Sequence, residues 1–199
     1  MLTIIFSMLV FALVGAISPG PVNIVATGAG ANYGFRGALP HVMGATLSYT
    51  LIVFLVGIGL NQLLAQVPEF ASILQYLGSA FLLWMAWKIA TAKPESLQGE
   101  TPSLPPKMLE GALCQGLNPK AWLVSMSGVS LFVSTQQPAA LFLMIFCAVS
   151  FAMCFIGVGS WALLGQVISR YLSNPTRQVM FNRIMAALLA TSILTIINV

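Results

Sequence analysis

Aspartate is absent from this chain, and its acidic side chains are confined to four glutamates. Only 6% of the residues are charged, whereas an ordinary soluble domain is roughly 25% charged. A surface built from this composition cannot be kept in water, because it offers too few groups that water solvates well. Hydrophobic residues make up 58% of the sequence, so the solvent that suits the chain is lipid.

The scarce residue types also exclude several kinds of site. No aspartate pair exists for an intramembrane protease, and neither a zinc-binding HExxH motif nor a phosphate-binding P-loop occurs. The single histidine and three scattered cysteines lack metal-ligand spacing. The net charge of +4 is spread between apolar runs, without the basic patch of a nucleic-acid-binding protein. We therefore expect no enzyme, no catalytic residue, no metal, no cofactor and no nucleic-acid partner.

Long apolar runs occupy most of the chain and predict an all-α polytopic membrane protein. A helix needs about 20 residues to cross a hydrocarbon core of ~30 Å. The runs are continuous, whereas strands of a membrane barrel would alternate polar and apolar residues. About six transmembrane helices are predicted, over residues 2–32, 38–60, 70–92, 108–134, 139–165 and 179–198. The first run lacks a preceding Lys or Arg, so we expect it to be retained rather than cleaved as a signal peptide.

A polar, proline-rich segment divides the chain nearly in half. Residues 93–107 are predicted to be a linker between a first three-helix repeat, 1–92, and a second, 108–199. A shift of 100 residues aligns Val56–Gly59 with Ile156–Gly159, Leu63–Val67 with Leu163–Val167, and Pro19 with Pro119. An odd number of helices in each half would place the second half upside down, as in the inverted repeats of transporters. The alternative is a composition bias shared by all membrane helices.

Basic residues predict the orientation of the chain. They lie in or beside the loops after the first, third and fifth predicted helices: Arg36, Lys88, Lys93, Lys107, Arg170, Arg177 and Arg183. Cytoplasmic loops carry an excess of Lys and Arg. The linker is therefore expected in the cytoplasm, with both termini on the periplasmic side.

Two of the predicted spans contain a proline motif that must kink or break the helix. The first holds Ser18, Pro19, Gly20, Pro21 and nearby Asn23, and the fourth holds Asn118, Pro119 and Lys120. Backbone groups freed by a break are tolerated in a membrane where they are buried in protein or line a cavity. Amides at the start of a half-helix suit a carboxylate, so these eight residues are the predicted substrate-binding set. The alternative is that each proline merely kinks a packed helix.

Three ionisable residues each have two possible roles. Lys120 lies about 18 Å along the fourth span, where it could pair with a substrate carboxylate or a half-helix C-terminus. It could instead extend to the cytoplasmic face. Arg36 is a candidate gate residue or only an orientation signal, and His41 is a candidate proton carrier or a packing residue.

The motifs together resemble the LysE/RhtB family of bacterial amino-acid exporters. The resemblance rests on Ser18–Pro21, on Gly34, Arg36 and Gly44, and on Asn118–Lys120, and it spans the whole chain. The segments Ala86–Thr91 and Tyr33–Arg36 are most similar to the cysteine/O-acetylserine exporter branch.

The resemblance implies proton-driven export of a small neutral amino acid or derivative through the bacterial inner membrane. The substrate is expected to be like cysteine and O-acetylserine, or like homoserine and threonine. The partners are then the substrate, protons and the lipid bilayer, and a homo-oligomer is compatible with this reading. Two other classes stay open: an ion channel or metal-ion exporter on the same scaffold, and a membrane subunit that transports nothing.

Overall fold

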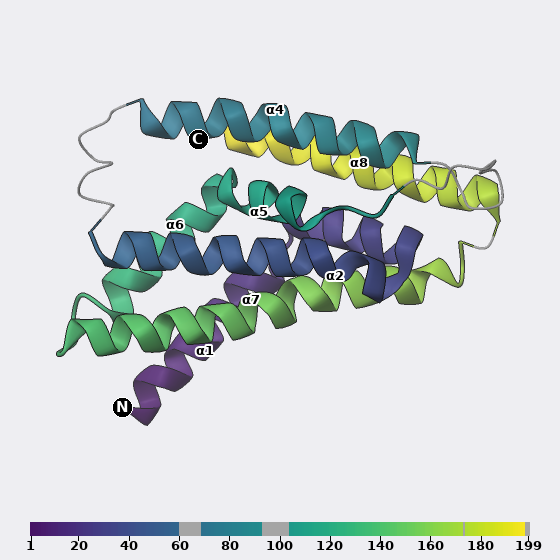
Figure 1. The fold of residues 1–199 in the computed structure, drawn as a ribbon. Coiled ribbons are helices and arrows are strands. Elements are labelled where there is room, and N and C mark those ends of the chain that lie inside the picture. Colours follow the sequence, from purple (N-terminus) through teal and green to yellow (C-terminus); the bar gives the residue numbers. More distant parts are fainter. Residues whose placement is uncertain (60–68, 93–103, 173, 198–199) are drawn as a thin grey trace.

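The structure, a computed structural model, describes residues 1–59, 69–92, 104–172 and 174–197. This part of the chain forms seven helices, which confirms the all-α prediction (Figure 1). They are α1 (Leu2–Ile17), α2 (Pro21–Gly57), α4 (Phe70–Thr91), α5 (Met108–Gly116), α6 (Pro119–Phe132), α7 (Ala139–Ser169) and α8 (Pro175–Ile197). Residues 93–103 of the predicted linker and the aligned run Leu63–Val67 lie outside the described residues.

Proline sets the two interruptions that the sequence predicts. Pro21 and Pro119 occupy the first turns of α2 and α6, where the missing N–H has no helical partner to lose. The helix before each proline has already ended, α1 at Ile17 and α5 at Gly116. The spans predicted over 2–32 and 108–134 are therefore each two helices rather than one kinked helix.

A single glycine replaces the loop that was predicted between the first two spans. Only Gly34 is non-helical inside α2, with φ 70° and ψ 172°, a conformation that glycine adopts readily because it has no Cβ. The ring Nε2 of His41 lies 3.3 Å from the carbonyl of Val22. A straight helix would hold residues 19 positions apart roughly 28 Å from each other, so the chain folds back at Gly34.

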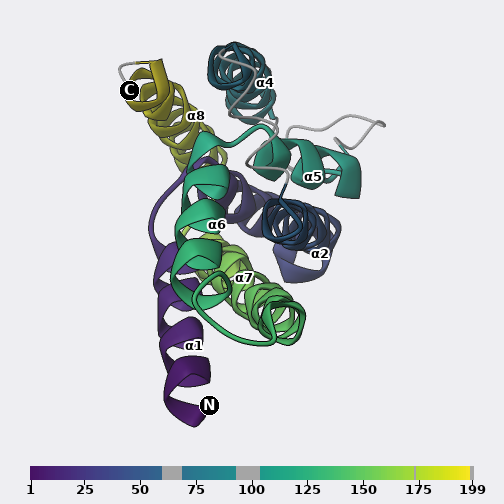
Figure 2. The same cartoon turned by 90° about the vertical axis from the view of Figure 1, so that its left-hand side faces the viewer.

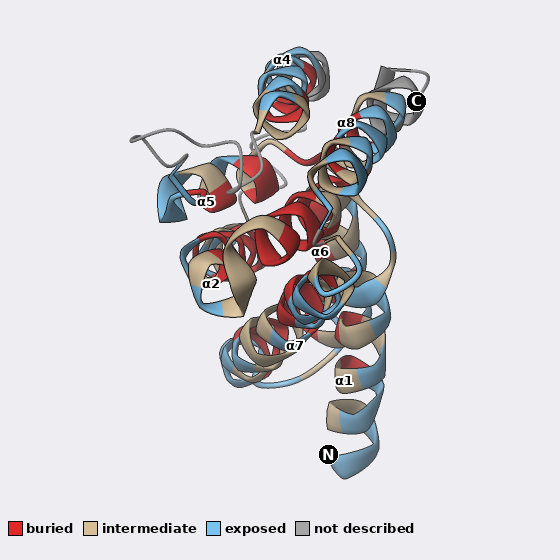
Figure 3. Ribbon diagram, turned by 90° about the vertical axis from the view of Figure 1, so that its right-hand side faces the viewer, coloured by how far each residue is buried: buried red, intermediate tan, exposed pale blue. Residues whose placement is uncertain are grey.

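Helix α2 forms the centre of the molecule. Buried residues concentrate on it in Figure 3, and it packs most extensively on α7 and α5. A Cβ added at Gly30 would lie 1.9 Å from the carbonyl oxygen of Ala162 in α7. One added at Gly44 would lie 1.9 Å from that of Met108 in α5. The helices thus approach backbone to backbone, as small residues allow in membrane proteins.

Helices α4 and α8 lie side by side and form the layer above this centre in Figure 1; Figure 2 shows the same pairing from the end. A polar cluster of Asn32, Gln178 and Asn182 connects this layer to α2 by hydrogen bonds. Asn32 of α2 donates to Asn182 Oδ1 at 2.9 Å and accepts from Gln178 at 3.0 Å. Asn182, which is fully buried, also donates to the carbonyl of Ala92 at 3.2 Å.

The outer surface of the bundle is apolar. Phe6, Leu51 and Trp87 are each more than half exposed. A water-soluble monomer rarely exposes so much apolar surface, whereas lipid covers it without cost. By length and composition, α2 and α7 can each cross a membrane, and α1 is a shorter apolar helix.

Candidate functional site

The end of α1 is capped by two nearby side chains and one from a distant part of the chain. The last carbonyls of a helix have no partner inside it. Here they accept hydrogen bonds from three side chains: Ser18 Oγ to Gly15 at 3.1 Å, Asn23 Nδ2 to Ala16 at 2.9 Å, and Trp161 Nε1 to Ile17 at 2.9 Å. Asn23 also donates to the Ser18 carbonyl at 3.0 Å, so the start of α2 holds the end of α1.

Lys120 joins the two helix breaks. Its ammonium donates to the Ser18 carbonyl at 3.1 Å, to the Ser18 hydroxyl, and to the Pro19 carbonyl at 3.5 Å. The C-terminal end of a helix carries partial negative charge, which favours a cation there. Of the partners considered for Lys120, the structure shows the half-helix C-terminus.

The second break is ordered mainly by its own residues. Asn118 caps α6, because its Oδ1 accepts from the backbone N–H of Lys120 at 3.1 Å. Its amide group donates to Gln115 Oε1 at 3.4 Å, and the indole of Trp122 donates to the Gly116 carbonyl at 2.9 Å. These bonds direct the first turn of α6, and the lysine on it, toward the end of α1.

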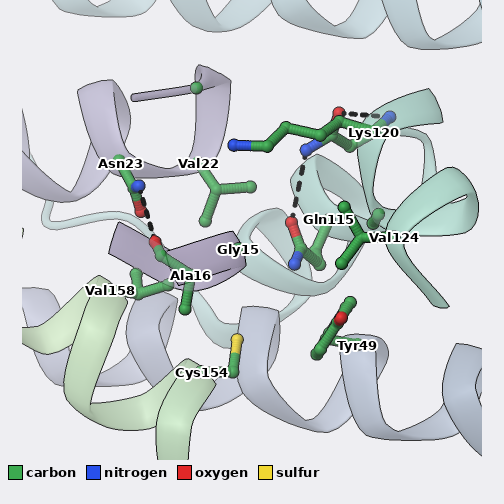
Figure 4. A pocket seen from close by; sticks show the side chains of 13 residues that line it. Gly15, Ala16, Val22, Asn23, Tyr49, Gln115, Lys120, Val124, Cys154 and Val158 are labelled. Carbon is green, nitrogen blue, oxygen red and sulfur yellow. Dashed lines mark hydrogen bonds between the residues drawn. The ribbon is translucent and has the colours of Figure 1, made fainter. Parts of the chain in front are cut away.

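A pocket lies where the breaks meet (Figure 4). The N-terminal residues of α2 and α6 form its polar side, and Figure 4 shows the Lys120 side chain extending toward Val22 and Asn23. The opposite side is less polar and comes from Tyr49, Cys154 and Val158. None of the described residues that line the pocket is acidic.

Most of the predicted binding set gathers at this place. Gly20, Asn23, Asn118 and Lys120 line the pocket, and Ser18 and Pro19 are the partners of Lys120. Pro21 and Pro119 are not in the pocket lining. They contribute indirectly, because they start the two helices whose first turns face the pocket. Whether this set binds a substrate stays a prediction.

The two predicted gate or coupling residues lie outside the pocket lining. Arg36 is exposed beside the Gly34 turn. His41 is fully buried, and its Nε2 must carry the hydrogen because the Val22 carbonyl can only accept. Its Nδ1 has no hydrogen-bond partner among the described residues. Their roles in gating and proton coupling also stay predictions.

Sequence reasoning missed three residues that shape the site: Gln115, Tyr49 and Trp161. Gln115 gave a usable signal, since it is a polar residue in an apolar run three positions before Asn118. Tyr49 and Trp161 gave none. Trp161 bonds a carbonyl 144 residues away, and a contact of that separation has no local pattern.

Comparison with known proteins identifies the family of this chain, by a family model and by several similar proteins. The model of the LysE type translocator family matches residues 13–193. The cysteine/O-acetylserine efflux protein of Escherichia coli (strain K12) is 31% identical over 193 residues, covering 94% of each chain. That of Klebsiella pneumoniae is 31% identical, with 94% of this chain and 93% of the relative covered. That of Shigella flexneri serotype 5b is 32% identical over 185 residues, with 90% of each covered. No solved structure matches the chain. The chain belongs to the LysE type translocator family, an amino-acid efflux family, and is a membrane transporter rather than an enzyme.

Proposed function

We propose that this chain exports small neutral amino acids or their derivatives, cysteine and O-acetylserine first among them, across the bacterial inner membrane. The proton gradient drives the transport. The observation that carries the proposal is the contact of Lys120, at the second helix break, with Ser18 and Pro19, at the first. Two interrupted helices whose ends meet at one pocket are the arrangement in which transporters hold small charged substrates.

The start of α2 suits the carboxylate of the substrate. Pro21 has no N–H, and the N–H of Ile24 already binds the Gly20 carbonyl at 3.0 Å. The N–H groups of Val22 and Asn23 therefore have no partner inside the helix. Both residues line the pocket, and N–H groups at a helix start form a ready site for an anion.

The rest of the pocket favours a small, neutral side chain. Its less polar wall includes Val158, Cys154 and the ring of Tyr49. A lysine- or arginine-like substrate would bring a second positive charge, which finds no acidic partner in the described lining and is repelled by Lys120. A metal-ion exporter is not favoured, because no group of three potential ligand residues occurs among the described residues.

We also propose that six membrane spans form two inverted repeats, residues 1–92 and 108–199, joined by a cytoplasmic linker over 93–107. The order of elements in the two halves supports this. A broken helix comes first in each, α1 with the start of α2 and α5 with α6. A long helix follows, 35–57 and α7, and then α4 and α8, which pack on each other.

Both termini are proposed to face the periplasm. In Figure 1 the two termini lie at the left-hand end, while the ends of α4 and α7 and the start of α8 lie at the right-hand end. Lys88 in the last turn of α4, Arg170 directly after α7 and Arg177 in the first turn of α8 belong to that right-hand end, which the positive-inside rule places in the cytoplasm. A C-terminal fusion to a reporter that works only in the periplasm should be active, and activity of a cytoplasm-only reporter would reverse the orientation.

The decisive experiment is export measured with purified protein. Vesicles that contain the protein are loaded with labelled cysteine or O-acetylserine, and a proton gradient is applied across the membrane. Efflux should saturate with substrate concentration, exceed that of empty vesicles and cease when an uncoupler removes the gradient. Lysine, tested in parallel, should leave no faster than from empty vesicles. Efflux of no amino acid would refute the substrate class, and ion flux that does not saturate would indicate a channel.

A further inference from the structure

We infer that the Ser18 carbonyl, the Ser18 hydroxyl and the Pro19 carbonyl form a subsite for a primary ammonium group, and that Lys120 fills it when no substrate is bound. The α-ammonium of the incoming amino acid then displaces Lys120 from these oxygens. This inference rests on the proposed function, and it gives Lys120 the role of an internal competitor rather than of a carboxylate partner.

The chemistry of the three oxygens carries the first step. A lysine ammonium and an amino-acid ammonium are the same donor group, with one positive charge and three N–H bonds. The structure shows all three oxygens accepting from Lys120 Nζ. They follow the C-terminal end of α1, whose partial negative charge favours any cation placed there. A site built for one ammonium is therefore suited to the other.

The surroundings show that Lys120 can be exchanged. The carbonyls of Ala16 and Ile17 are held by the uncharged side chains of Asn23 and Trp161. The Ser18 carbonyl also accepts from Asn23, and the remaining bonds to it and to the Pro19 carbonyl come from the end of the flexible four-carbon stem of Lys120. Gly20 leaves the space beside this stem open, because a Cβ there would lie 3.7 Å from Lys120 Nζ and 3.9 Å from its Cδ.

The same stretch of chain supplies partners for both charges of an amino acid. The ammonium acceptors belong to Ser18 and Pro19, and the N–H groups without a helical partner at the start of α2 belong to Val22 and Asn23. The two charged groups of an amino acid are bonded to one carbon, so their partners must be neighbours. Two ammonium groups cannot share the three oxygens, because like charges at contact repel each other strongly.

Substrate binding and Lys120 binding are therefore mutually exclusive. Return of Lys120 to the oxygens would help to expel the substrate on the far side of the membrane. A neutral residue at position 120 should thus bind the amino acid more tightly and release it more slowly. If Lys120 instead held the carboxylate, the same substitution would weaken binding.

Two measurements test the inference. In the first, binding and transport of labelled O-acetylserine are compared between the wild type, Lys120→Gln and Lys120→Met. We expect both variants to bind several-fold more tightly, with a lower KM and a lower kcat, and Ser18→Ala to bind more weakly. Binding at least several-fold weaker in both Lys120 variants, in protein that elutes and melts like the wild type, would overturn the inference.

The second measurement uses the wild type alone, so it does not depend on a variant folding. Ethylamine, which has an ammonium but no carboxylate, is added before a short pulse of an amine-acylating reagent, supplied in excess because ethylamine itself is acylated. The ratio of Lys120 to Lys88 labelling, read by mass spectrometry, should rise, since Lys88 pairs with Glu110 outside the pocket and serves as the reference. Sodium propionate, which lacks the ammonium, should leave the ratio unchanged.

The outcomes separate the two proposals. An unchanged labelling ratio with ethylamine in a protein that binds O-acetylserine refutes the ammonium subsite but leaves the exporter intact. A raised ratio in a protein that neither binds nor exports any amino acid refutes the exporter, while the subsite for an ammonium stands.

Discussion

The close approach of α2 and α7 at Gly30 gives a stability prediction with a matched control two residues away. In Gly30→Ala the new Cβ would lie 1.9 Å from the Ala162 carbonyl oxygen, which belongs to the backbone of α7. The two helices must then move apart or shift. In Gly28→Ala the nearest atoms are the two methyl groups of the Ile89 side chain, at 3.9 Å, an ordinary contact.

The comparison isolates the cost of the contact. Both glycines are buried in the same part of α2, so both substitutions gain the same helix propensity, about 1 kcal/mol over glycine. The difference between the variants is then the cost of overpacking, typically about 1–3 kcal/mol. For a protein of this size 1 kcal/mol shifts Tm by about 2–4 °C, so Gly30→Ala should melt roughly 2–12 °C below Gly28→Ala.

Thermal unfolding of the purified variants in one detergent checks this prediction. Gly165→Ala provides a test from the other helix, because its Cβ would lie 2.1 Å from the Thr27 carbonyl of α2. It should be destabilised like Gly30→Ala. The packing of α2 on α7 described above would be wrong if Gly30→Ala and Gly165→Ala melted at or above the temperature of Gly28→Ala.

Two further predictions concern transport and the layer formed by α4 and α8. Pro19→Ala should abolish efflux, because it disturbs the junction of the two breaks, and Lys120→Ala should lower the kcat of efflux, because a neutral residue at position 120 releases the substrate more slowly; both proteins should stay in the membrane fraction. Near-normal efflux from both variants would contradict the assignment of the site to this junction. Asn182→Leu should lower the free energy of unfolding by about 1–3 kcal/mol, since it removes the hydrogen bonds that Asn182 makes with Asn32 and with the Ala92 carbonyl. Met180→Ala, at an exposed position of the same helix, should melt like the wild type, and equal melting of the two variants would show that the polar cluster does not stabilise the layer.

Properties that depend on neighbouring residues followed from the sequence alone. Long apolar runs predicted helices because a backbone in lipid must bond within its own segment. Proline removes a donor and cannot continue a helix, so the interruptions before Pro21 and Pro119 were predictable from those residues. The family motifs around Ser18 and Lys120 likewise lie in short local strings, and the family that they predicted is the one whose model matches residues 13–193.

Only the tertiary structure decided what the interrupted helices face. The partner of Lys120 lies 102 residues away at Ser18, and the cap of the Ile17 carbonyl is 144 residues away at Trp161. The sequence showed that these backbone groups would be freed, but the choice among possible partners depends on how distant helices pack. The extent of the turn at Gly34 was decided in the same way. The chain can fold back at one residue because both arms of α2 are buried against other helices. That packing cannot be predicted from the residues next to Gly34.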